Sequence, residues 1–189
     1  MVICGDTLVP IDKLGGICMQ TATKEFHWEM AHMLENHNGL CKNVHGHSYK
    51  MQVTIGRNDG KVITDDDELA AEGMVMDFSK IKNVVNRLFV DKLDHAFVFN
   101  SNSDSPAVHE ILEILLKYHM KVFGFPFRTT AENMAEYIGK TLQAEFLGSM
   151  YSVLKIRLYE TVTGFAEWKP DLYIKFAGPD LHGNIEAKL

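Results

Sequence analysis

The stretch Cys41-Lys-Asn-Val-His-Gly-His-Ser-Tyr-Lys-Met-Gln-Val-Thr-Ile55 carries the clearest structural signal in this 189-residue chain. From His47 onward polar and apolar residues alternate, which is typical of a β-strand with one buried face. The apolar positions are Tyr49, Met51, Val53 and Ile55. His45 and His47 share their parity, so both imidazoles are predicted to lead into a buried face, where they need polar partners or a metal.

The segments around this strand predict an α+β domain with an antiparallel sheet. Further strands are expected at residues 17–30, 121–127 (where Pro126 indicates an edge or the exit of a strand), 151–160 and 172–176. Helices are expected at residues 79–90, from Pro106 onward, and from a capping box at Thr129–Glu132 to Phe146. In the strand at 151–160, the buried face is predicted to consist of Leu154, Ile156 and Leu158.

Composition indicates a single globular domain over residues 1–189, with 46% hydrophobic and 23% charged residues. The net charge of -6 argues against general nucleic-acid binding, and no apolar run approaches the roughly 18 residues of a membrane span. Residues 1–16 lack the pattern of a signal peptide, and three cysteines (Cys4, Cys18, Cys41) do not form a disulfide framework. We therefore expect a cytoplasmic protein in which Cys41 is a free thiol.

A third histidine, His32, ends the strand-like run before the polar loop at residues 35–44. If that loop brings His32 near His45 and His47, the three imidazoles form a zinc site with a fourth position open, as in catalytic zinc centres. Ordinary histidines at the edge of a loop are equally consistent with the spacing.

Two further positions could move protons. Cys41 stands four residues before His45, and beside a divalent cation its thiol could act as a base or nucleophile. The spacing alone also allows a fourth zinc ligand or an inert buried side chain. Asp94 precedes His95 directly, and a carboxylate can orient an imidazole for proton transfer, although such pairs are common by chance.

Glu160 shares the parity of Ile156 and Leu158, so it is predicted to end the buried face of its strand. A carboxylate there needs donors, and the guanidine-like edge of a ligand could supply two. The alternative is a frayed strand end at which Glu160 meets water.

Taken in order, these motifs resemble the 6-pyruvoyltetrahydropterin synthase superfamily over about residues 20–168. The matching segments are Phe26–His32, Cys41–His47, Gly73–Phe78, Leu93–His95, Thr130–Asn133 and the Glu160-Thr161 pair. The resemblance implies the tunnelling fold, in which ββααββ protomers carry helices on one face of an antiparallel sheet. It also implies an oligomeric barrel, a homohexamer built as a dimer of trimers.

The resemblance assigns roles to the residues above. It implies Zn2+ bound by His32, His45 and His47, with Cys41 as the proton-abstracting base. Asp94, His95 and Glu160 would form the relay, while Glu160 and Thr130 would bind the pterin substrate. The relay pair and the Cys41 loop are expected to come from different subunits. Two departures are Thr129, where many relatives have proline, and a longer segment at 97–127 with an extra helix.

Three residues separate Cys41 from His45, which resembles the bacterial 6-carboxytetrahydropterin synthases of the queuosine precursor pathway. The expected reaction converts 7,8-dihydroneopterin triphosphate into 6-carboxytetrahydropterin, acetaldehyde and triphosphate. The rival functions are a 6-pyruvoyl-forming synthase without carbon–carbon cleavage and a non-catalytic zinc- or pterin-binding module. An unrelated zinc hydrolase is disfavoured, because the general-base glutamate motif is missing near the histidines.

Overall fold

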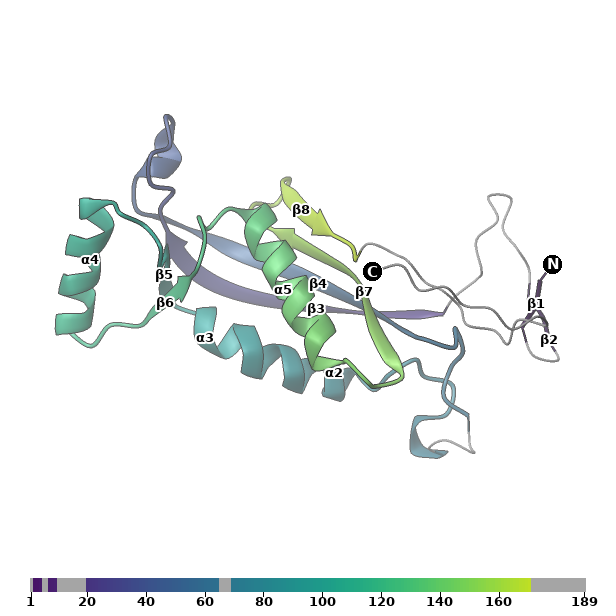
Figure 1. Cartoon of the computed structure of the whole chain (residues 1–189). Coiled ribbons are helices and arrows are strands. Elements are labelled where there is room, and N and C mark those ends of the chain that lie inside the picture. The colour runs from purple at the N-terminus through teal and green to yellow at the C-terminus, as the bar shows by residue number, and fades with distance from the viewer. Residues whose placement is uncertain (1, 5–6, 10–19, 65–68, 171–189) are drawn as a thin grey trace.

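The computed structural model describes residues 2–4, 7–9, 20–64 and 69–170. Its centre is a six-stranded sheet with the strand order β6-β5-β3-β4-β7-β8 (Figure 1). The strands are β3 (Thr21–His32), β4 (His45–Arg57), β5 (Ala96–Asn100), β6 (Val122–Phe125), β7 (Tyr151–Tyr159) and β8 (Phe165–Trp168). A two-stranded hairpin pairs β1 (Val2–Cys4) with β2 (Thr7–Val9).

The predicted antiparallel sheet is confirmed for β3, β4, β7 and β8, whereas β5 pairs parallel to β3 and β6 pairs parallel to β5. The sheet is therefore mixed, and β6 lies at its edge as the sequence predicted. Sequence analysis missed β5 and β8, which have only five and four residues. The strand expected at 172–176 lies outside the described residues.

The helices are α2 (Phe78–Val85), α3 (Asp91–Leu93), α4 (Pro106–Lys117) and α5 (Ala131–Glu145). A π-helical turn (Asn86–Val90) joins α2 to α3, and short 3-10 turns occupy Leu40–Lys42 and Leu69–Ala71. These positions confirm the predicted helices. None of the described helices is both long and apolar enough to cross a membrane.

The predicted cap of α5 is one residue out of place. Thr130, and not Thr129, is the N-cap, and its hydroxyl accepts a hydrogen bond from the N–H of Asn133. Thr129 is fully buried and instead turns toward His32. Because Thr130 caps the helix, the backbone carbonyl of Thr129 is available to His32.

The main core lies between one face of the sheet and the helices α2, α3 and α5. It joins Trp28 and Met51 of the strands to Ile81, Leu93 and Ile138 of these helices. We call the surface of β3 and β4 that faces this core the helix face, and the opposite surface the polar face.

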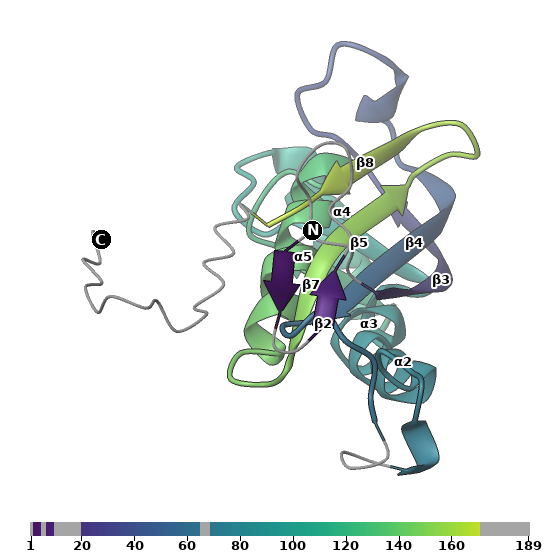
Figure 2. The same ribbon diagram turned by 90° about the vertical axis from the view of Figure 1, so that its right-hand side faces the viewer.

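The helix α4 is the exception to the expected one-sided cover. Phe97 packs with Val108 of α4, whereas its neighbours Ala96 and Val98 belong to the main core. Because side chains alternate along a strand, α4 lies on the other face of the sheet, at its β5–β6 end. Figure 2 shows β4, β7 and β8 side by side, with the loop between β3 and β4 extending beyond the end of the sheet.

The buried face of β7 is shifted by a β-bulge. Ile55 pairs with Val153 and Thr54 pairs with Lys155, so Leu154 is the extra residue. Val153, Ile156 and Leu158 are consequently buried, and the predicted burial of Leu154 is wrong. Simple alternation cannot reveal a bulge from the sequence.

Candidate metal centre

The antiparallel pairing of β3 with β4 brings the three histidines together. His32 is directly opposite His45, and Met30 is opposite His47. All three imidazoles lie on the helix face, and their potential ligand atoms lie within 4.8 Å of one another. His32 has no exposed surface, whereas His45 and His47 are partly buried. The parity argument from the sequence is therefore confirmed, and His32 joins the cluster through strand pairing.

Backbone carbonyls determine which nitrogen of two imidazoles faces the cluster. The Nδ1 atom of His32 lies 3.0 Å from the carbonyl oxygen of Thr129, and Nδ1 of His45 lies 2.8 Å from that of Asn43. A proton on each Nδ1 leaves Nε2 as a lone-pair donor. The Nε2 atoms of both residues are buried without a hydrogen-bond partner. This set fits a divalent metal, because imidazole ligands commonly donate their second N–H to a carbonyl.

Burial also favours the neutral forms of His32 and His47. The pKa of His32 is lowered to about 4, chiefly by desolvation and then by the neighbouring His45. Desolvation likewise lowers the pKa of His47, against an opposing contribution from Glu160. Neutral imidazoles at pH 7 are the protonation state that a metal ion requires.

Glu160 follows β7 directly and reaches the same cluster. Its Oε1 atom lies 3.6 Å from Nε2 of His32 and 4.0 Å from Nε2 of His47. It also accepts a 3.1 Å hydrogen bond from the hydroxyl of Tyr49, a buried residue of β4. The predicted placement of Glu160 at the end of the buried face is confirmed, and 31% of its side chain remains exposed.

Tyr49 is a neighbour that sequence analysis did not identify as part of the site. Its ring packs edge-on against His32 and His47. Burial, followed by the charge of Glu160, raises the pKa of Tyr49, so the phenol stays a neutral donor to the carboxylate. Because Tyr49 shares the parity of His47 along β4, the sequence could have indicated that it lies beside the site. No sequence pattern indicated the contact of the Thr129 carbonyl, because it is a backbone atom 97 positions from His32.

Cys41 lies on the 3-10 turn of the loop that joins β3 to β4, as a partly buried free thiol. Its carbonyl accepts a 2.8 Å hydrogen bond from the N–H of Leu34. Among the described residues, the clustered ligand atoms are those of the three histidines, and the thiol is not one of them.

Asp94 and His95 form a pair, but away from the histidine cluster. His95 Nδ1 lies 3.0 Å from Asp94 Oδ1, and 78% of the His95 side chain is exposed. The same Oδ1 accepts a hydrogen bond from the N–H of Glu29, which lowers the pKa of Asp94. His95 has a positive φ of 59°, and its N–H donates to the carbonyl of Glu29.

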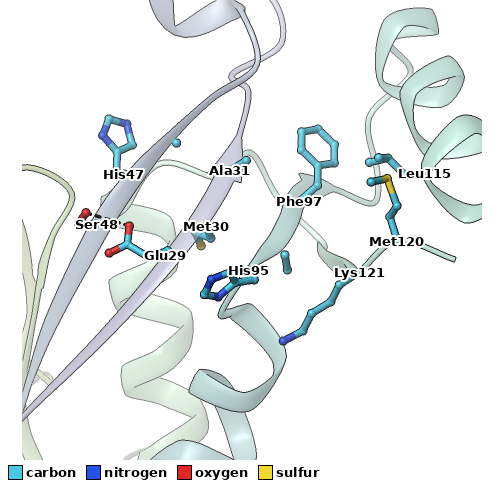
Figure 3. Close-up of a pocket in the computed structure, with 12 residues that line it drawn as sticks. Glu29, Met30, Ala31, His47, Ser48, His95, Phe97, Leu115, Met120 and Lys121 are labelled. Atoms are coloured by element: carbon cyan, nitrogen blue, oxygen red, sulfur yellow. Dashed lines mark hydrogen bonds between the residues drawn. The ribbon is translucent and has the colours of Figure 1, made fainter. Parts of the chain in front are cut away.

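A pocket of about 580 Å³ surrounds His95. Its lining includes the polar-face residues Glu29 and Ser48, together with Phe97 and Lys121, and it also borders His47. The ribbons of β3 and β4 lie between the rings of His47 and His95 (Figure 3). Within one chain, the relay pair and the three histidines therefore lie on opposite sides of the sheet. Thr130, the remaining predicted substrate contact, is the cap of α5.

Comparisons with known proteins agree with this geometry. Residues 21–171 match the family model described as 6-pyruvoyl tetrahydropterin synthase. The chain is 40% identical over 147 residues to a Haemophilus influenzae protein named 6-carboxy-5,6,7,8-tetrahydropterin synthase, covering 78% of this chain and 96% of that relative. An Aquifex aeolicus protein of the same name is 35% identical over 136 residues, covering 69% and 76%.

Solved structures share the fold. An uncharacterized protein from Wolinella succinogenes superposes with a TM-score of 0.67 at 18% identity, covering 80% of this chain and 98% of that structure. The 6-pyruvoyl tetrahydropterin synthase of Caenorhabditis elegans gives a TM-score of 0.51 at 22% identity, covering 82% and 99%.

Proposed function

Because the chain belongs to the 6-pyruvoyl tetrahydropterin synthase family, we propose that it is a zinc-dependent 6-carboxy-5,6,7,8-tetrahydropterin synthase. It would convert 7,8-dihydroneopterin triphosphate and water into 6-carboxytetrahydropterin, acetaldehyde and triphosphate, a step toward queuosine precursors. It would work in the cytoplasm as a homohexamer. The observation that carries the proposal is the set of three histidines on the helix face, two with free buried Nε2 atoms, beside the carboxylate of Glu160.

In the proposed mechanism, His32, His45 and His47 hold zinc, which when bound supplies Lewis-acid polarisation of the side-chain oxygens of the substrate. Cys41 removes a proton from the polarised side chain. Glu160 accepts donors from the pterin ring and is held in place by the Tyr49 hydroxyl. Thr130 lies at the start of α5, where its hydroxyl would contact substrate.

Asp94 orients His95, which returns protons to the reacting carbons. Because this pair lies on the polar face, it would serve the metal centre of a neighbouring copy. That requirement is the physical reason for proposing an oligomer: one chain alone would hold the metal and the relay on opposite sides of its sheet.

Product analysis tests the proposal. Zinc-loaded protein is incubated with 7,8-dihydroneopterin triphosphate, and the products are identified by mass spectrometry. Formation of 6-carboxytetrahydropterin and acetaldehyde is expected. The 6-pyruvoyl product would instead assign the chain to the synthases without carbon–carbon cleavage, and bound but unchanged pterin would show a binding module.

Replacing Cys41 by Ala tests whether this residue is a catalytic base or a metal ligand. We expect C41A to keep its zinc and to lose about 100- to 10,000-fold in kcat, the usual contribution of a positioned acid or base. Zinc content is measured by elemental analysis and kcat by product formation. Loss of zinc together with activity would make Cys41 a ligand and refute its role as the base.

A further inference from the structure

Arg128 differs from the other three arginines of the chain. Arg57 donates to Asp59, Arg87 to Glu145 and Arg157 to Glu167. Arg128 is only half-buried, yet its Nε and Nη2 atoms are buried and neither has a hydrogen-bond partner. A guanidinium cannot lose its charge near neutral pH, so buried donors without an acceptor are unfavourable unless a ligand supplies one.

The two unpartnered atoms of Arg128 form one edge of the guanidinium. Arg57 uses the same edge, donating from Nε and Nη2 to the two oxygens of Asp59 at 3.1 and 2.9 Å. Arg157 likewise directs both atoms at Glu167. The edge is suited to two oxygens of one anion, either a carboxylate or a phosphate. Arg128 therefore presents a complete anion fork without the anion.

The backbone connects Arg128 to the metal centre. The next residue, Thr129, offers its carbonyl to Nδ1 of His32. The carbonyl of Arg128 accepts from the N–H of Thr130 and from the side-chain amide of Asn133, at 2.8 and 2.9 Å. These bonds fix the loop between β6 and α5 against the histidine cluster and the start of α5. The guanidinium is thus carried by a segment that borders the candidate site.

The buried atoms without partners point to ligands of opposite charge. Among the described residues they occur in Trp28, His32, His45 and Arg128. The two imidazole nitrogens are lone-pair donors suited to a cation, whereas the arginine nitrogens are N–H donors suited to an anion. Both sets of atoms gain partners if the imidazoles bind a metal ion and the substrate on that metal carries a polyphosphate that binds the guanidinium.

We propose that Arg128 binds the triphosphate of the substrate through Nε and Nη2. The identity of the anion rests on the proposed function, whereas the anion fork itself rests on the contacts of Arg128. Arg128 contacts the leaving group and not the carbons that react. Its contacts hold substrate and transition state alike, so its loss raises KM more than it lowers kcat.

The test measures binding of inorganic tripolyphosphate by titration calorimetry to the zinc-loaded protein and to the R128Q and R128K variants. R128Q is expected to raise Kd by about 10- to 100-fold, the usual effect of losing charge-assisted hydrogen bonds. R128K, which keeps the charge but not the fork, should have an intermediate effect. Zinc content is measured before and after titration, because polyphosphates chelate divalent cations.

R87Q is the matched control, because Arg87 is an exposed arginine paired with Glu145. It should leave Kd for tripolyphosphate unchanged. An unchanged Kd in R128Q would overturn the proposal. So would R128Q dissociating the oligomer in analytical ultracentrifugation without altering Kd, since Arg128 would then pair with a carboxylate of a neighbouring copy.

Turnover distinguishes the two proposals. If the unmodified protein binds tripolyphosphate through Arg128 but does not convert dihydroneopterin triphosphate, the anion site stands and the proposed function falls. If it converts the substrate and R128Q leaves KM unchanged, the proposed function stands and the role of Arg128 falls.

Discussion

His32 ends β3 and His95 directly precedes the neighbouring strand β5, yet the two residues differ in burial and in hydrogen-bond partners. His32 has no exposed surface and its Nδ1 faces the Thr129 carbonyl, while 78% of the His95 side chain is exposed and its Nδ1 faces the Asp94 carboxylate. A neutral carbonyl partner and burial favour an uncharged metal ligand. A carboxylate partner and access to solvent favour an imidazole that gains and loses a proton.

The contrast supports the proposed separation of tasks, in which the helix face would hold a cation and the polar face would move protons. Four experiments test this proposed separation.

The largest effect is expected for the buried ligand. H32Q removes one of the three imidazoles. Loss of a residue that only hydrogen-bonds a metal ligand costs about 10- to 100-fold in metal affinity. We therefore expect H32Q to lower zinc affinity by at least about 100-fold and to show no measurable turnover. Zinc affinity is measured by competition with a chromophoric chelator. Zinc affinity equal to that of the unmodified protein would exclude His32 as a ligand.

On the polar face, H95Q should lower kcat by about 100- to 10,000-fold without changing zinc content. Steady-state kinetics and elemental analysis measure the two quantities. Mixed oligomers of H32Q and H95Q chains sharpen the comparison, because a site formed between copies regains activity when each chain supplies the face that the other lacks. An absence of regained activity would place both functions within one chain.

The pH dependence of stability comes next. In the metal-free protein, the pKa of His32 is about 4, below the ordinary value of 6.5. As the pH falls, the unfolded chain therefore takes up the proton first, and stability that is complete above pH 6.5 is lost between pH 6.5 and 4. The difference corresponds to about 3 kcal/mol in the free energy of unfolding.

Denaturant titrations of the metal-free protein at several pH values measure this loss. H32Q, which has no proton to gain, should show a loss smaller by about that amount. An equal loss in both proteins would assign the acid sensitivity to other groups.

The smallest effect is expected at Gly46, between the two clustered histidines of β4. A Cβ there would lie 3.0 Å from the carbonyl oxygen of Met30 on the neighbouring strand. G46A should therefore lower the free energy of unfolding by about 1 kcal/mol, as crowding of a packed site does. S48A, at an exposed position on the same face of β4, is the control. If S48A and G46A lowered the free energy of unfolding equally, the close approach of the two strands at Gly46 would not explain the effect.

The sequence predicted the site better than the sheet. Parity alone placed His45, His47 and Glu160 on one face, because alternation along a strand is a local property. The parallel pairing of β5 and β6 could not be predicted in this way, since it depends on crossovers of more than ten residues, although the strand β6 itself was expected. Only the family resemblance led us to expect the separation of His95 from the histidine cluster, because sequence order does not tell which side of a sheet a loop residue reaches.

The residues that hold the ligands in place were the hardest to predict. Thr129 acts through its carbonyl, which every residue possesses, and Arg128 became notable only when its donors were seen to lack acceptors. Such roles depend on what surrounds an atom and not on the type of residue.

The bulge at Leu154 has a consequence for how this chain tolerates changes in length. Val153 and Glu160 are seven positions apart, yet both face the helices, because the extra residue reverses the alternation between them. Deleting Leu154 would join Val153 to Lys155 and restore a regular ladder, with both halves of β7 keeping their present sides. Deletion of any residue from Ile156 to Leu158 would carry Glu160 away from the histidines. The bulge can therefore lose one residue in evolution without moving Glu160, whereas the regular ladder that follows it cannot.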